Sequence, residues 1–318
     1  MLCPARNEQS AKRAITVSLL AKTIKKLLRR QFSGWSEGSI AEQRARQEKS
    51  SRFNRLPAGV HCSQLTANGV SAEWIEGPAA DAGVILYLHG GAYALGSING
   101  YREWIARLAV ATHTRALAIN YRLAPEHPFP AALEDTLSTY NWLLDQGVSP
   151  ARIIVAGDSA GGGLTLAALL SLRDGSHSLP AAAVCISPWA DLTLSGASMQ
   201  SKASLDPILD PDSLQMYAGY YAGDHDLTAP LLSPTYADLA GLPPLLIQVG
   251  TDEILLDDAR HLAERASEAG VDVTLEVWDE MFHVFQLISF LPETKKAVDQ
   301  IAEFVAANLP PPLSLSAT

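Results

Sequence analysis

Cysteine is scarce in this sequence, with three residues in 318: Cys3, Cys62 and Cys185. An odd and sparse count supplies neither a disulfide framework nor the ligand spacing of a zinc site. We therefore expect the cysteines to be small apolar fillers in a reducing compartment, and we expect no metal ion and no cofactor.

Long apolar runs are also missing, because no stretch of about eighteen consecutive apolar residues occurs. A membrane-spanning helix is therefore not expected. Residues 14–21 are apolar, but polar residues 7–9 precede them and Lys22 follows directly. This pattern does not favour a secretory signal peptide, so a cytoplasmic protein is the expectation. With 47% hydrophobic and 18% charged residues, the chain has the composition of a globular protein.

The two charge signs are unevenly distributed along the chain. Residues 1–55 carry 13 Lys and Arg against 4 Asp and Glu, a net charge of +9, whereas the rest carries 11 against 30, a net charge of −19. Such a basic arm could bind nucleic acid or a membrane surface. No aromatic residues are interleaved as single-strand binding would need, so no nucleic-acid partner is expected. The simpler interpretation is that the arm packs on its own acidic body.

The N-terminal arm shows helical periodicity. Apolar residues spaced by three and four over residues 10–30 form one stripe, and Lys and Arg fill the other face. Residues 39–52 predict a second, polar helix. The pair is too small for an independent core, so we expect residues 1–55 to form a cap over the mouth of an active site.

Beyond residue 56 the pattern changes to short strands that alternate with helices. Asn68-Gly69 joins the first two strands and is a strong hairpin signal. The expected strands are residues 60–67, 71–76, 84–88, 116–120, 152–156, 181–187, 245–249 and 273–277. The expected helices are residues 101–112, 131–146, 162–170, 212–222, 256–269 and 293–307. This alternation predicts an α/β fold, a mostly parallel sheet covered on both faces.

The strongest motif is Gly157-Asp158-Ser159-Ala160-Gly161, which lies between a β-branched apolar strand and a helix. Gly-x-Ser-x-Gly in this context predicts a nucleophile elbow, in which the Ser159 hydroxyl stands above the sheet. The Ala160 N–H lies at a helix N-terminus, where negative charge is stabilised.

A serine nucleophile needs a base and an acid that orients the base. Asp252 is the first acid after the strand 245–249, and we expect it to be that acid, with Glu253, Asp257 and Asp258 as competitors. His283 follows the last strand and completes the chain order serine, acid, histidine. The triad predicted from the sequence is Ser159, Asp252 and His283.

An oxyanion hole is expected from His89-Gly90-Gly91-Ala92, which follows the strand beside the nucleophile strand. Glycine lets backbone N–H groups point into a site. The N–H groups of Gly90, Gly91 and Ala160 would bind the oxyanion, and His89 would hold the loop.

Taken together, three segments resemble the bacterial hormone-sensitive-lipase family of α/β-hydrolase esterases, in the subgroup with Asp before the nucleophile. They are Leu88-His89-Gly90-Gly91-Ala92-Tyr93, Asn120–Ala132 and Gly157–Gly162. The resemblance covers residues 84–305. It implies an eight-stranded sheet with an antiparallel second strand, a helical cap, and hydrolysis of esters with short to medium acyl chains. It also implies that the catalytic acid and histidine stand at Asp252 and His283. Family members often pair, which allows for a homodimer.

Sequence pattern and resemblance together predict a helical cap segment at residues 1–55 and a catalytic domain at 56–310, with 188–225 contributing to the cap. The Pro- and Ser-rich residues 311–318 are expected to be a loose tail. Two departures from the family pattern occur: Ala92 replaces the third oxyanion glycine, and Glu253–Asp258 replaces a shorter segment after the acid. Alanine supplies the same N–H group, and we keep Asp252 as the expected acid.

The substrate pocket is expected to be apolar and to suit neutral acyl chains. The residues expected to bind substrate are Tyr93, Asp158, Trp189, Phe282 and Phe285. Further lining is expected from Phe32 and Trp35 of the cap. The insertion after Trp189 would add Leu194, Met199, Leu205, Ile208, Met216, Tyr217 and Tyr220.

Three other functions remain open at this stage. A binding module that has lost catalysis is disfavoured because His283 is present. An amidase or peptidase with the same triad is not separated from an esterase by the sequence. A lipase that uses the basic amphipathic arm at a membrane surface would show activity that jumps on emulsified long-chain substrate.

Overall fold

The computed structural model of the chain describes residues 18–32, 34, 36–51 and 55–311. Their centre is one eight-stranded sheet with the order β1-β2-β4-β3-β5-β6-β7-β8. The strands are β1 His61–Ala67, β2 Val70–Glu76, β3 Val84–Leu88, β4 Arg115–Asn120, β5 Ile153–Asp158, β6 Ala182–Ile186, β7 Leu245–Gly250 and β8 Val273–Trp278. β2 runs antiparallel to both of its neighbours, and all other pairs are parallel. The expected α/β fold with an antiparallel second strand is confirmed.

The residues of the strands explain their places in the sheet. Every residue of β3, β5, β6 and β7 is buried, as expected for apolar, β-branched runs covered on both faces. β1 forms one edge and is largely exposed. Asn68 and Gly69 both have positive φ, at 46° and 91°, which is the backbone that a tight hairpin turn requires.

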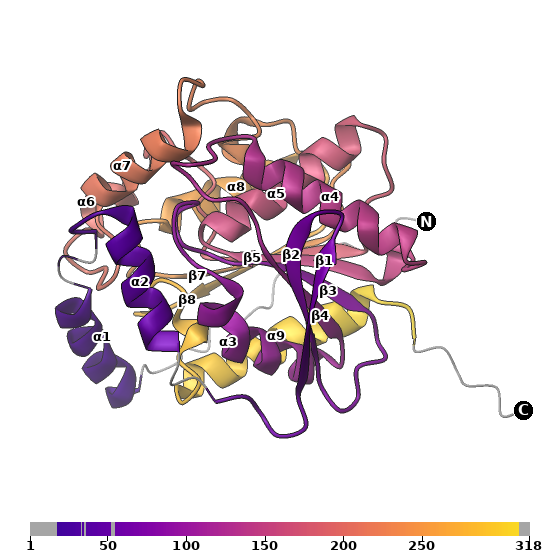
Figure 1. The fold of residues 1–318 in the computed structure, drawn as a ribbon. Coiled ribbons are helices and arrows are strands. Elements are labelled where there is room, and N and C mark those ends of the chain that lie inside the picture. Colours follow the sequence, from indigo (N-terminus) through magenta and orange to yellow (C-terminus); the bar gives the residue numbers. More distant parts are fainter. Residues whose placement is uncertain (1–17, 33, 35, 52–54, 312–318) are drawn as a thin grey trace, which may run out of the picture.

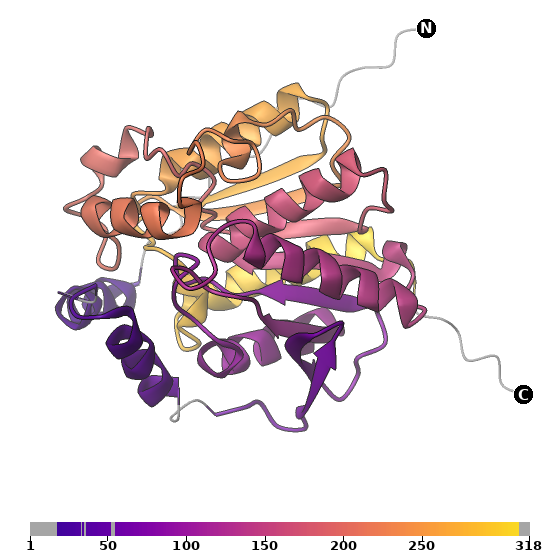
Figure 2. The same ribbon diagram turned by 45° about the horizontal axis from the view of Figure 1, so that its top comes forward.

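Helices cover both faces of the sheet (Figures 1 and 2). α4 Ala131–Asp145, α5 Ala160–Asp174 and α8 Leu256–Glu268 lie on one face, and α3 Ile98–Thr112 and α9 Pro292–Asn308 lie on the other. Short helices are η1 Pro150–Arg152, η2 Pro234–Tyr236 and η3 Phe285–Leu287. An apolar core fills each interface. None of the described helices is long and apolar enough to cross a bilayer.

Four helices gather beyond the carboxyl ends of the parallel strands: α1 Leu19–Gln31, α2 Ile40–Ser51, α6 Ser198–Ser201 and α7 Pro211–Ala222. Figures 1 and 2 show them together at one end of the molecule. Ser18 caps α1 by accepting the Ala21 N–H at 3.1 Å. Trp35 and residues 10–17 of the expected first helix lie outside the described residues.

The basic helix α1 packs on acidic side chains of the body, as its charge indicated. Lys25 forms an ion pair with Asp252, Lys22 lies 3.1 Å from Glu280, and the backbone N–H of Ser18 donates to Glu293 at 2.8 Å. On its inner face, Ala21 and Leu28 join an apolar cluster with Phe282 and Phe285. Apolar contact and ion pairing therefore hold α1 against the turn after β8.

Candidate active site

Ser159 stands at the turn between β5 and α5, in a backbone conformation that few residues adopt. Its φ of 54° and ψ of −121° lie outside the regions favoured by L-residues. Such a conformation persists only where its surroundings enforce it. The Ser159 N–H donates to the Ile186 carbonyl at 2.8 Å, and its own carbonyl accepts the Trp189 N–H at 2.9 Å. The expected strained turn is present.

The glycines on either side of Ser159 are required by close backbone contacts. A Cβ atom on Gly157 would lie 2.2 Å from the Gly161 carbonyl oxygen, and a Cβ on Gly161 would lie 2.0 Å from the Leu88 carbonyl oxygen. β3, β5 and the start of α5 therefore approach more closely than any side chain permits.

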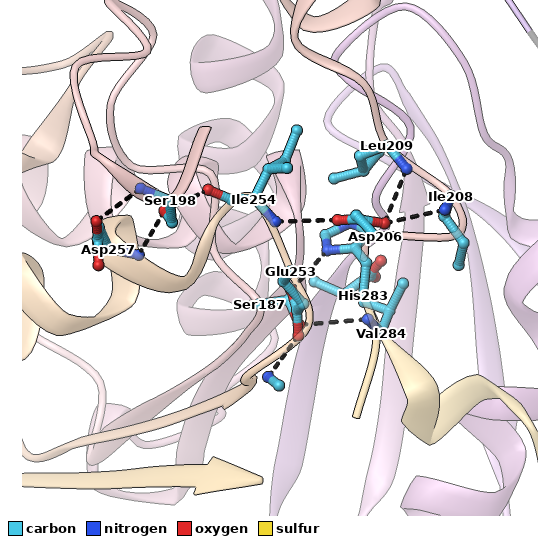
Figure 3. Close-up of polar contacts among 12 residues, drawn as sticks. Ser187, Ser198, Asp206, Ile208, Leu209, Glu253, Ile254, Asp257, His283 and Val284 are labelled. Atoms are coloured by element: carbon cyan, nitrogen blue, oxygen red, sulfur yellow. Dashed lines mark hydrogen bonds and ion pairs between the residues drawn. The ribbon is translucent and has the colours of Figure 1, made fainter. Parts of the chain in front are cut away.

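His283 follows β8 and is 3% exposed. Its Nδ1 lies 2.9 Å from the Glu253 Oε2 atom (Figure 3). His283 also lines the same cavity as Ser159. Burial alone would lower the pKa of His283. The hydrogen bond to Glu253 and the negative charges of Glu253, Asp206 and Asp158 outweigh burial, so the pKa lies above its ordinary value.

The prediction that Asp252 pairs with His283 is wrong, because Glu253 occupies that place. Glu253 is fully buried, and its second oxygen, Oε1, accepts the Gly250 N–H at 2.5 Å and the Ser187 hydroxyl at 2.8 Å. Asp252 points away and forms an ion pair with Lys25 of α1. Two adjacent side chains in the turn after β7 face different partners, and the inward one is Glu253.

A second buried carboxylate, Asp206, lies close to Glu253 and His283 (Figure 3). It was not identified in the sequence analysis. One oxygen accepts the N–H groups of Ile208 and Leu209, at 2.9 and 3.0 Å, and the other accepts that of Ile254 at 3.0 Å. Burial raises the pKa of Asp206 to about 6, despite the opposing effect of His283 and these hydrogen bonds. Asp206 thereby ties the segment before α7 to the turn that carries Glu253.

The predicted oxyanion donor Gly90 is already engaged, because its N–H donates to Asp158 Oδ1 at 3.0 Å. The N–H groups of Gly91, Ala92 and Ala160 have no acceptor within the part of the chain that the structure describes. Gly91 and Ala92 line the cavity beside Ser159 and have positive φ, at 120° and 52°. Among the described residues, the geometry therefore leaves Gly91 and Ala92, and not Gly90, with free N–H groups beside the cavity.

Asp158 was expected to contact substrate, but its oxygens already have partners. Oδ1 also accepts the Tyr87 hydroxyl at 2.8 Å, and Oδ2 accepts the Tyr101 hydroxyl at 3.1 Å. Burial raises the pKa of Asp158 to about 6, against the lowering effect of these hydrogen bonds and of the charge of His283. Asp158 lines the cavity and holds the loop of Gly90 and Gly91 through the Gly90 N–H.

The chain matches a family described as alpha/beta hydrolase fold over residues 85–287. A crystal structure of an esterase from the bacterial hormone-sensitive lipase family is 45% identical, has a TM-score of 0.88, and is matched over 92% of this chain and 98% of that chain. This chain belongs to the bacterial hormone-sensitive-lipase family of α/β-hydrolases.

Curated proteins that are similar in sequence to this chain carry acetyl-hydrolase or esterase names. An acetyl-hydrolase from Streptomyces hygroscopicus is 48% identical over 242 residues, which cover 76% of this chain and 81% of the relative. An esterase from Acinetobacter venetianus is 39% identical over 250 residues, which cover 78% and 82%. Family and relatives identify the chain as a carboxylic ester hydrolase.

The cavity of this hormone-sensitive-lipase family member has a volume of about 310 Å³. Of the five residues expected to bind substrate, Asp158 and Phe282 line it. Tyr93, Trp189 and Phe285 do not. They are buried in the core, where the Tyr93 ring stacks on Tyr221 at 3.6 Å and Phe285 packs on Trp278.

Most other residues that line this pocket come from the helices at its mouth and from the segment before α9. Phe32 and Ile208 were expected from the sequence. The residues that sequence analysis missed include Leu28, Gln31, Gln47, Leu209, Leu214, Leu287 and Ile288. The apolar positions of Leu28 on α1 and Leu214 on α7 were visible in the sequence, but the face of each helix that meets the cavity was not.

Proposed function

We propose that the chain is a serine carboxylesterase that hydrolyses short- to medium-chain acyl esters through an acyl-enzyme intermediate. One observation carries the proposal: Ser159, on a strained turn, shares a cavity with His283, whose far side is held by the buried carboxylate of Glu253. This is the arrangement of a nucleophile, a base and an orienting acid.

The hydrogen bond to Glu253 places a proton on Nδ1 of His283 and leaves Nε2 free to accept one. When an ester enters, Nε2 takes the Ser159 proton as the serine oxygen bonds to the carbonyl carbon. The negative charge that develops on the carbonyl oxygen is stabilised by the N–H groups of Gly91, Ala92 and Ala160. The imidazolium is stabilised by the carboxylate of Glu253.

Collapse of the tetrahedral intermediate breaks the bond to the alcohol, which leaves with the proton from His283. Water then enters, His283 Nε2 accepts its proton, and the hydroxide oxygen bonds to the acyl carbon. The same three N–H groups hold the second oxyanion, and the carboxylic acid departs as Ser159 recovers its proton.

The size and lining of the cavity support short to medium acyl groups. Its volume of about 310 Å³ lies at the lower end of the range typical of small-molecule sites, about 300–1,000 Å³. Leu28, Phe32, Ile208, Leu209 and Leu214 enclose it with apolar side chains. The name of the Streptomyces relative, an acetyl-hydrolase, supports the same preference.

The experiment is a p-nitrophenyl ester series from acetate through butyrate and hexanoate to laurate and palmitate. The wild type should turn over the short members fastest. Ser159→Ala should lower kcat by about 10⁴-fold or more, because only the oxyanion donors and binding remain. Ser138→Ala on α4 is the matched control and should retain full activity.

A brief incubation with phenylmethylsulfonyl fluoride, followed by peptide mass spectrometry, should place the modification on Ser159. Equal turnover by the wild type and Ser159→Ala would refute the serine mechanism. Fastest turnover of palmitate would refute the proposed acyl range and leave the mechanism standing.

A further inference from the structure

Large exposed apolar side chains concentrate along α1. Among the described residues, eight large hydrophobic side chains are exposed, and five of them lie on α1 or on segments that its ends contact. These five are Leu19, Leu20, Leu27, Leu205 and Phe290, with Leu19 84% and Phe290 61% exposed.

Hydrogen bonds place Leu205 and Phe290 near opposite ends of α1. Arg29, in the last turn of α1, donates to the Leu205 carbonyl at 3.0 Å. The Ser18 N–H, at the first turn, donates to Glu293, three residues after Phe290. Thirteen helical residues span about 20 Å. The exposed apolar groups therefore form a strip of about that length along α1. Figures 1 and 2 show α1 at the outer edge of the molecule.

Cationic side chains accompany this strip. A hollow of about 480 Å³ beside α1 is lined by Lys22, Lys25, Lys26, Arg29 and Arg30, together with Leu205 and Glu280. Lys22 and Lys25 are paired with carboxylates of the body. Lys26 and Arg30 are exposed, and within the described part of the chain neither makes a hydrogen bond or an ion pair.

Leucines beside lysines and arginines on the outward side of one helix are the pattern of helices that lie in the plane of an anionic lipid surface. The body opposes that attraction, since residues 56–318 carry a net charge of −19. The face that α1 presents has the complementary sign, with Lys26 and Arg30 exposed on it. The buried face of the same helix supplies Leu28 to the active-site cavity, so a surface bound by α1 would lie next to the mouth of the pocket.

We propose that the outer face of α1, with Leu205 and Phe290 at its ends, docks on anionic lipid surfaces. The leucines enter the boundary of the acyl chains, and Lys26 and Arg30 meet the lipid phosphates. Docking does not depend on catalysis, so its test and that of the esterase activity are separate.

The test is co-sedimentation of the full chain with vesicles of pure phosphatidylglycerol and of pure phosphatidylcholine. We expect binding to phosphatidylglycerol that weakens as salt rises and little binding to phosphatidylcholine. Leu19→Gln/Leu27→Gln, which keeps good helix formers, should lower partitioning about tenfold. Lys26→Gln and Arg30→Gln should each lower it about fivefold.

The matched controls lie elsewhere on the surface: Tyr236→Ser for exposed apolar area and Arg260→Gln, on α8, for charge. Both should bind vesicles like the wild type. All variants should hydrolyse dissolved p-nitrophenyl acetate at the wild-type rate, because none of the changed residues lines the cavity.

Three results would overturn the proposal. One is the absence of binding to phosphatidylglycerol at low salt, and another is equal binding by the leucine variant. The third is a drop in melting temperature or in oligomer mass for the leucine variant with vesicle binding unchanged. That result would show that the chain itself or a second copy covers the strip.

Discussion

Asp252 and Glu253 are neighbouring acids, and replacing each one separately decides which of them orients His283. In Glu253→Gln, the side-chain carbonyl oxygen can still accept the Gly250 N–H and the Ser187 hydroxyl. The amide NH₂ then faces Nδ1 of His283, where the carboxylate had been an acceptor. That donor selects the tautomer with its proton on Nε2, which cannot accept the Ser159 proton.

The opposite amide orientation is disfavoured as well. It would aim an NH₂ group at the Gly250 N–H, and a buried donor without an acceptor costs about 1–3 kcal/mol. We therefore expect kcat/KM of Glu253→Gln to fall about 10³–10⁴-fold, as when a triad acid is replaced by its amide. This loss corresponds to about 4–5.5 kcal/mol of transition-state stabilisation.

Asp252→Asn is the matched control, because it removes the same charge one residue earlier. It breaks only the ion pair with Lys25, which is partly exposed, so kcat/KM should change less than about threefold. Both variants are assayed on p-nitrophenyl butyrate, with circular dichroism to confirm folding. A large loss in Asp252→Asn with activity kept in Glu253→Gln would refute this reasoning.

Activity should rise with pH as His283 loses its proton, with a midpoint above its ordinary value of about 6.5. Asp206→Asn removes a negative charge that raises this pKa, so the midpoint of kcat/KM should move to lower pH; an unmoved midpoint would count against the coupling. Gly161→Ala should cost about 3 kcal/mol or more in urea unfolding, since its Cβ would lie 2.0 Å from a β3 carbonyl oxygen. Gly219→Ala, whose Cβ meets nothing within 4 Å, should be neutral or stabilising. Lys25→Met should raise KM more than it lowers kcat, and an unchanged KM would show that α1 stays in place without the ion pair.

The sequence predicted the sheet, the turn at Ser159 and the location of His283 because local signals determine them. Apolar β-branched runs mark the buried strands, and the small residues of the elbow mark a turn that no larger side chain could enter. The order of the parallel strands then brings the turns after β5, β7 and β8 to one edge of the sheet.

Contacts between distant residues could not be predicted in this way. Asp252 and Glu253 both follow a buried strand, and the choice between them depends on the rotation of one turn and on Lys25, 227 residues earlier in the chain. The Gly90 N–H donates to Asp158, which lies 68 residues later in the chain. Tyr93 and Phe285 are aromatic residues of a kind common in ligand pockets, but both are buried among other rings in the core.

The hydrogen bonds of Ser187 join the ends of three neighbouring strands. Its hydroxyl, just after β6, donates to Glu253 beyond β7 and accepts the Val284 N–H beyond β8 at 3.3 Å. The spacing between acid and histidine is thus inherited from the sheet and not from the cap. The 188–225 segment begins one residue later. Exchanging it between relatives would test whether it sets the proposed acyl preference while Glu253 and His283 keep their geometry. Such a graft needs to preserve Asp206, which ties the exchanged segment back to the turn of Glu253.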